Sequence, residues 1–281
     1  MTTLAPTLES MPSPTSQPVR RRKPRRKGKT LHVYTWLILL WMFLPIAVMA
    51  AFGFNDTHSR YNFTWQGFTL RWWQNLFAIP NLTGSLVNSF TIAIIVTLFA
   101  VILGTPMGIA LGRYRFRGHG MTDLVLFANI AAPEIGLGAA LLSLYISMGL
   151  PRGYWTIVIA HIMFTIPFVA ITVRARMSGF DISLEEAARD LGAGPLTTFR
   201  LVTLPMIIPG VIAGALLSFA LSIDDFIITE FTAGQTLTFP LWIWGASRLG
   251  VPPQADVMGT IIFLVGALLA LVSGFLLRHR D

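Results

Sequence analysis

Cysteine is absent from this 281-residue chain, which excludes disulfides and thiolate metal sites. Charged residues are also scarce, at 12%, whereas the hydrophobic fraction reaches 54%. A soluble fold of this length would leave much of that apolar surface in contact with water. The composition therefore predicts an integral membrane protein. The short alternating strands of a membrane β-barrel are missing, so we expect it to be all-α.

Familiar catalytic motifs are missing as well. The chain contains no HExxH and no GxSxG sequence, so an intramembrane protease or lipase would lack its nucleophile and its metal ligands. The letters GKT at residues 28–30 resemble the end of a phosphate-binding loop, but Lys23 stands where that motif requires glycine. We therefore do not expect the chain to hydrolyse ATP by itself.

Six apolar segments approach or exceed the roughly 20 residues that a helix needs to cross a bilayer. They cover residues 31–54, 86–111, 122–148, 154–173, 206–230 and 257–277. The first is longer than the apolar region of a cleaved signal peptide, which favours a retained span. We predict six transmembrane helices within a single domain, residues 31–281. In the second span, Gly104 and Gly108 have the spacing that can bring two helices close together.

Positive charge is distributed unevenly along the chain. Eight of the 21 Lys and Arg residues lie within residues 20–29, and others gather in the loop 174–205 and near the C-terminus. The positive-inside rule then places this loop and both termini in the cytoplasm. Residues 1–30 contain too few apolar side chains to form a core and are predicted to be disordered. Their basic run directly precedes a span, which favours contact with membrane lipid over nucleic acid.

One polar segment stands between two of these spans: SLEEAARDLGAGPLTTFRLVTLP, residues 183–205. Ser183 and Glu186 have the spacing of a capping box, which predicts a helix start. Gly192 then has the position of a left-handed C-terminal cap. Pro195 can open a second helix, and Pro205 is predicted to end it.

The first of these two helices has a small apolar face. It consists of residues at positions i, i+3, i+4 and i+7, namely Leu184, Ala187, Ala188 and Leu191. Glu185, Arg189 and Asp190 are expected to point elsewhere. The pattern predicts a two-helix projection into the cytoplasm. By itself it leaves open whether the apolar face docks on another protein or packs on its own helix bundle.

The order Glu186-Ala187-Ala188, three residues, Gly192, nine residues, and Val202-x-Leu204-Pro205 resembles the EAA loop of permease subunits in binding-protein-dependent ABC importers. Val202 replaces the more usual Ile. The resemblance implies the type I ABC importer permease architecture, in the inner (cytoplasmic) membrane. It also implies that the loop couples to a cytoplasmic ATPase dimer. The residues that would carry this coupling are Glu186, Ala187, Ala188, Gly192, Leu204 and Pro205.

The same resemblance implies the other components of the transporter. ATP would be bound by the ATPase, and no cofactor by this chain. A second, related permease and an extracytoplasmic substrate-binding protein would complete the complex.

Longer stretches resemble the second permease subunit of spermidine/putrescine transporters. They include PEIGLGAALLSLY (133–145), IAHIMFTIPFVAITVRARM (159–177) and GALLSFALSIDDFIIT (214–229). The resemblance implies import of polyamines by alternating access. A permease of the same architecture for an iron or phosphonate compound stays an alternative. A membrane scaffold or enzyme without transport activity is disfavoured by the absent catalytic motifs.

Carboxylates within the spans are candidates for the substrate path, because ionisable groups at membrane depth usually face a bundle interior or a cavity. Glu134 is expected near the midplane, about 18 Å from the cytoplasmic end of its span. Asp225 is expected near the outer mouth, on a polar stripe with Ser218, Ser222 and Thr229. We predict Glu134 and Asp225 to be successive stations for a cation.

Asp224 points about 100° away from Asp225 on a helix, and we expect it to pair with a neighbouring helix. It is a further path candidate together with Ser222. A purely structural role of the buried carboxylates stays open. His161, a lone histidine in the fourth span, is expected to be a packing residue.

Overall fold

The computed structural model describes residues 29–59 and 61–278, and these are mostly helical. Their one β pairing is an isolated antiparallel bridge between Asn55 and Phe68. The chain divides into two units, Met1–Pro45 and Ile46–Asp281. The first unit holds most of helix α1 (Lys29–Phe52). Residues 1–28 of the tail that we predict to be disordered lie outside the described residues.

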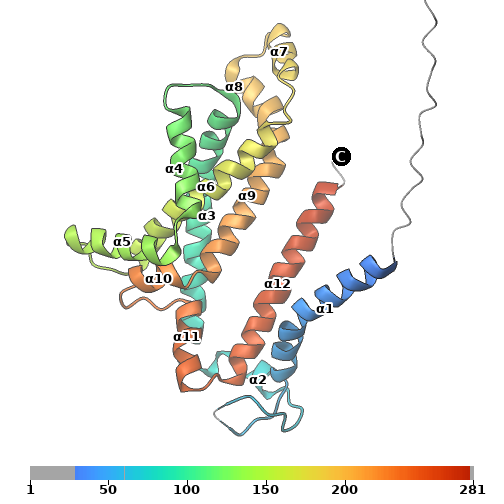
Figure 1. The fold of residues 1–281 in the computed structure, drawn as a ribbon, viewed down its shortest axis with the longest axis vertical. Coiled ribbons are helices and arrows are strands. Elements are labelled where there is room, and N and C mark those ends of the chain that lie inside the picture. Colours follow the sequence, from blue (N-terminus) through green and yellow to red (C-terminus); the bar gives the residue numbers. More distant parts are fainter. Residues whose placement is uncertain (1–28, 60, 279–281) are drawn as a thin grey trace, which may run out of the picture. The chain divides into compact units, whose positions relative to one another are not determined.

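The second unit contains all other elements (Figure 1). Before the cytoplasmic loop they are α2 (Arg71–Gln74), the 3-10 turn η1 (Leu76–Ala78), α3 (Leu82–Arg113), α4 (His119–Ala131), α5 (Glu134–Ser147) and α6 (Tyr154–Met177). The loop and the segments after it form α7 (Ser183–Asp190), α8 (Pro195–Thr198), the π-helical turn η2 (Phe199–Thr203), α9 (Leu204–Asp224), α10 (Ile227–Thr232), α11 (Phe239–Leu249) and α12 (Pro253–Arg278).

Helices α3, α6 and α9 run side by side and form the centre of this unit (Figure 1). Glycines of α3 allow its backbone to approach α6. A Cβ added at Gly104 would lie 2.8 Å from Cβ of Val169, and one at Gly108 would lie 2.5 Å from the carbonyl oxygen of Ala170. The close approach expected from the spacing of the two glycines is confirmed. Small residues act here as they do at many helix interfaces in membranes.

Two of the predicted spans are interrupted. The third consists of α4 and α5, which meet at an angle of 105°. Ala132 is extended (φ −67°, ψ 137°) because the following Pro133 disfavours the helical conformation of the residue before it. The fifth breaks at Asp225, which is also extended (φ −63°, ψ 124°) and separates α9 from α10. Our expectation of continuous helices over residues 122–148 and 206–230 was therefore wrong.

Among the described residues, four helices are long and apolar enough to cross a membrane, and five if the bent pair counts as one span. They include the predicted first, second, fourth and fifth spans. The sixth predicted span coincides with α12. The all-α membrane fold is confirmed, whereas the count of six crossings and the cytoplasmic position of both termini stay predictions.

Candidate functional site: a cytoplasmic loop and two helix breaks

The loop 174–205 forms two helices joined by a glycine turn. Gly192 adopts the left-handed conformation (φ 86°), as predicted for a C-terminal cap of α7. Pro195 opens α8, also as predicted. Pro205 does not end a helix, because the chain stays helical from residue 195 through the π-turn η2 to residue 224. Pro205 instead lies within this continuous helix, directly after the π-turn η2, where the helical hydrogen-bond ladder is already irregular.

The predicted capping box of Ser183 and Glu186 does not form. Ser183 is already the first residue of α7, and no side chain caps the helix through the N-cap residue Ile182. The carboxylate of Asp181 instead accepts a hydrogen bond from the backbone N–H of Ser183 at 3.0 Å. Hydrogen bonds from Ser183 hold the pKa of the Asp181 carboxyl below its usual value. Asp181, which precedes the predicted box, therefore accepts the hydrogen bond from a backbone N–H at the start of α7.

Four leucines of the loop are uncovered. Leu191 is 90% exposed and Leu196 78%, and Leu184 and Leu201 are exposed as well. Among the predicted coupling residues, Glu186 and Ala187 are exposed and Ala188 is half-buried. Within the described part of the chain, the leucines at the two ends of this face therefore lie open rather than packed on the helix bundle.

Glu185 is the buried residue of α7, with a side chain only 1% exposed. Its Oε1 accepts hydrogen bonds from Arg113 Nη1 at 2.7 Å and from Thr203 Oγ1 at 2.6 Å. Arg113 Nη2 forms an ion pair with Oε2, and Arg189 reaches the same oxygen at 3.3 Å. Burial would raise the pKa of Glu185, but the hydrogen bonds from Arg113 and Thr203 outweigh it and lower the pKa.

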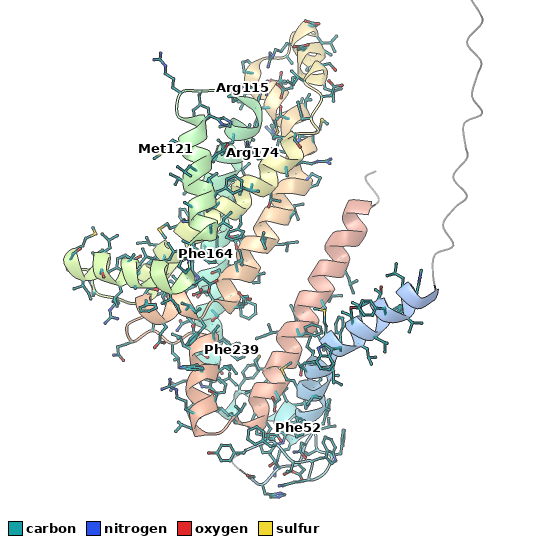
Figure 2. The ribbon with its side chains drawn as sticks, viewed as in Figure 1. Phe52, Arg115, Met121, Phe164, Arg174 and Phe239 are labelled. Carbon is teal, nitrogen blue, oxygen red and sulfur yellow. The ribbon has the colours of Figure 1, made fainter. Side chains whose placement is uncertain are left out.

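Sequence reasoning missed this role of Glu185. Helical periodicity separated it from the apolar face but could not indicate its partner Arg113, which lies 72 positions earlier. The run of arginines that ends the second span was the available signal. Figure 2 shows Arg115 and Arg174 at the end of the helix core that leads to α7.

Asp225 is held in a buried network around His161. His161 Nε2 lies 3.2 Å from Asp225 Oδ2 and 3.0 Å from Thr229 Oγ1, and His161 Nδ1 lies 2.9 Å from Ser222 Oγ. The same carboxylate oxygen accepts the backbone N–H of Thr229 at 2.8 Å. The ring of His161 is edge-on to Phe164, which lies within the helical core (Figure 2). His161 is thus a satisfied packing residue, as expected.

The two adjacent aspartates have the opposite environments from those we expected. Asp225 pairs with a neighbouring helix, whereas Asp224, for which we expected that pairing, is exposed at the end of α9. The helix ends between them, so the relative direction of their side chains does not follow the 100° step of a continuous helix. The polar stripe is also divided by this break, and Ser218 is buried with no hydrogen-bond partner among the described residues.

Glu134 is exposed in the first turn of α5, directly after the other helix break. Because α4 and α5 are sharply bent, the depth expected from a straight helix does not apply to it. Helix α5, which begins at Glu134, packs against α10, which begins three residues after Asp224. Two exposed carboxylates therefore lie at two neighbouring interruptions of the helical backbone.

The described residues contain no group of three or more His, Asp or Glu side chains arranged to hold a metal ion. The family of binding-protein-dependent transport system inner membrane components matches residues 71–281. The chain belongs to this family. It is an inner-membrane permease subunit of an ABC importer, and as such it is a component of a transport complex rather than an enzyme by itself.

Curated relatives of the permease cover nearly its whole length. The spermidine/putrescine transport system permease protein PotC of Haemophilus influenzae is 34% identical over 89% of this chain and 97% of its own length. PotC of Escherichia coli K12 is 35% identical over 86% of this chain and 92% of its own. The putrescine transport system permease protein PotI of the same strain is 34% identical, over 86% and 88%.

Solved structures support the fold of the permease. A chain of a bacterial ABC transporter that imports the polysaccharide alginate superposes with a TM-score of 0.64, with 16% identity, over 92% of this chain and all of that one. A chain of the MetNI methionine transporter in an inward-facing conformation gives a TM-score of 0.59, with 16% identity, over 71% and 96%. At this identity the likeness concerns the fold alone.

Proposed function

We propose that this permease forms one half of a membrane path for polyamines such as spermidine and putrescine. The observation that carries the proposal is the pair of exposed carboxylates, Asp224 and Glu134, at two neighbouring helix breaks. Irregular backbone at membrane depth is tolerated where it is buried in protein or lines a water-filled cavity. Carboxylates at such a position can replace part of the water that a multiply charged cation loses.

The roles of the two adjacent aspartates differ in this proposal. Asp224 faces the cation together with Glu134. Asp225 and Ser222 are bonded to His161 and keep the break in a fixed geometry. The polyamine transport of the curated relatives PotC and PotI supports a cationic substrate for the same architecture.

The cytoplasmic loop docks on an ATPase dimer. Its exposed leucines and the neighbouring Glu186, Ala187 and Ala188 form the contact, while Gly192 turns the chain and Leu204 and Pro205 lead into α9. The ATPase binds and hydrolyses ATP, and this chain binds no cofactor. A second, related permease completes the path, and an extracytoplasmic binding protein delivers the substrate.

Uptake of labelled putrescine and spermidine tests the substrate. Cells that lack this chain should show little ATP-dependent uptake, and restoring the chain should recover it. Excess unlabelled polyamine should compete. Unchanged uptake, with an ATPase still co-purifying, would overturn the polyamine substrate and point to a permease for another solute, such as an iron or phosphonate compound.

Single variants test the site within the same assay. Asp224→Asn and Glu134→Gln should each raise the KM for uptake by about tenfold, which corresponds to the loss of one contact to a charged group. Asp190→Asn is the matched control, because Asp190 is an exposed carboxylate at the far end of α7. Normal KM values in both path variants would contradict the assignment of the cation site.

A further inference from the structure

Helix α7 buries a charged residue and exposes an apolar one, which is the reverse of an ordinary amphipathic helix. Its buried side chain is the carboxylate of Glu185, whereas Leu184 on the same helix is exposed. Burying a charge is costly, and an ionised carboxylate stays buried only where it is paired and hydrogen-bonded. Glu185 meets this condition through Arg113 and Thr203, which come from two other segments of the chain. The charge therefore joins parts of the permease that an apolar side chain would leave unlinked.

The two partners of Glu185 stand at the ends of membrane-spanning helices. Arg113 is the last residue of α3, and its guanidinium holds both oxygens of the carboxylate. Thr203 is the last residue of the π-turn η2, immediately before α9. π-helical turns are rare in proteins, and those that occur often lie at functional sites. Polar contacts therefore connect α7 directly to the end of α3 and to the start of α9.

Helices α3 and α9, which contain or follow these two partners of Glu185, pack tightly in the core of the permease. Gly104 and Gly108 bring α3 into backbone contact with α6. At the same end, Arg176 of α6 donates a hydrogen bond to the carbonyl oxygen of Met206 in α9 at 3.0 Å. Arg174 forms an ion pair with Asp123 of α4. A displacement of Arg113 or Thr203 is therefore a displacement of several packed helices.

We infer that Glu185 is a positioning residue that transmits the motion of the ATPase-docked loop to α3 and α9. It acts through Arg113 and Thr203 and contacts neither substrate nor ATPase. The inference rests on the proposed coupling role of the loop. A merely structural anchor would change how much folded transporter is obtained. A transmitting residue changes how strongly ATP affects the membrane path once the transporter is assembled.

The absence of cysteine offers a readout that needs no knowledge of the substrate. A single cysteine in place of Ile135, which is 62% exposed next to Glu134, can be labelled with a water-soluble maleimide. The whole transporter, purified through a tag on this chain and placed in proteoliposomes, is labelled with and without ATP and vanadate. In the otherwise unchanged chain, trapping with ATP and vanadate should alter the labelling rate about tenfold.

Glu185→Gln removes the charge and nearly preserves the shape of the side chain. We expect this variant to retain its ATPase and to hydrolyse ATP, while the change in labelling rate is largely lost. Thr203→Val, which removes one hydrogen bond, should reduce the change partially. Asp190→Asn is the control on the same helix and should behave like the unchanged chain.

The outcomes separate the inference from the proposed function. A full ATP-dependent change in Glu185→Gln would overturn the transmitting role while leaving ATPase docking intact. If that variant does not assemble, a full change in Thr203→Val overturns the role and a reduced change supports it. If the unchanged chain retains no ATPase, the proposed function fails and the inference fails with it.

Discussion

The contact between His161 and Asp225 ties α6 to the second helix break, with Nε2 of the histidine 3.2 Å from Oδ2 of the aspartate. Both side chains are nearly inaccessible, with exposed fractions of 1% and 4%. The carboxylate is also bonded to the backbone N–H of Thr229 at the start of α10. Asp225 therefore stabilises the interruption, whereas its neighbour Asp224 is exposed.

Replacing His161 by Leu should destabilise the permease. The substitution leaves the Asp225 carboxylate buried with fewer partners, for which we expect a loss of about 3 kcal/mol in the free energy of unfolding. Thermal unfolding of the purified protein in detergent measures the effect. His58→Leu is the matched control, because His58 is exposed, and it should change stability by less than about 0.5 kcal/mol. Equal stability of the two variants would contradict the structural role of the network.

Leu191→Ser should weaken ATPase binding without affecting folding. Leu191 is 90% exposed, so the substitution removes little packing within the chain itself. For the loss of an apolar anchor at this interface we expect a cost of about 1.4 kcal/mol, which corresponds to a roughly tenfold weaker complex. The weakening is measured by co-purification of the ATPase at increasing dilution of the complex in detergent. Phe63→Ser, in the loop after α1 and 75% exposed, should bind the ATPase normally.

Gly192→Ala should distort the turn between α7 and α8. The site has open space around a Cβ, so the penalty arises from the left-handed backbone, about 1–2 kcal/mol for a residue other than glycine. Gly192→Asn should be milder, because asparagine tolerates this conformation better. Uptake and ATPase co-purification should fall in the order Gly, Asn, Ala. If Ala and Gly behaved alike, the turn would not constrain the docking surface.

Two glycines of α3 should respond in opposite ways to the same substitution. Gly84 has no neighbour within 4 Å of an added Cβ, so Gly84→Ala should stabilise the helix by up to about 1 kcal/mol. At Gly108 the added atom would lie 2.5 Å from the Ala170 carbonyl oxygen, so Gly108→Ala should destabilise by about 2 kcal/mol. Thermal unfolding of both variants tests the contact between α3 and α6. A stabilising Gly108→Ala would rule out this close approach.

Acid should weaken the anchoring of α7 only at low pH. The pKa of Glu185 is lowered in the folded chain, because its hydrogen bonds outweigh the effect of burial. A lowered pKa means that the ionised carboxylate contributes its full stability above the unfolded value, near 4.3, and loses it as the pH falls through the folded value. The stability difference between the unchanged chain and Glu185→Gln should be constant from about pH 8 to pH 5 and shrink below that. A difference that already declines near pH 7 would be inconsistent with the lowered pKa.

Local signals in the sequence were sufficient for several features. Apolar length predicted the membrane helices, Gly192 predicted the left-handed turn, and Pro195 predicted the start of α8. These features depend on the conformational preferences of single residues and on contact with lipid. Both can be inferred directly from the residue types in the sequence. The glycine pair of α3 likewise predicted close packing, although not its partner.

Features that depend on distant partners were not predictable in this way. The depth assigned to Glu134 assumed a straight helix, although Pro133 was a signal for a break. Burial of Glu185 requires Arg113 from another helix, and the role of Asp225 requires His161. Helical periodicity indicates which residues share a face, but not which face is covered.

The glycine contacts of α3 limit where the permease can deform. Because side chains and a carbonyl oxygen of α6 pack directly onto Gly104 and Gly108 of α3, the two helices have little freedom to slide or separate. Rearrangement then has to be absorbed where the helical hydrogen-bond ladder is already interrupted, at Pro133 and at Asp225. The same two interruptions carry the exposed carboxylates Glu134 and Asp224. Any hinge motion there changes the distance between the two negative charges, so release of a cation and bending of the chain would be a single event.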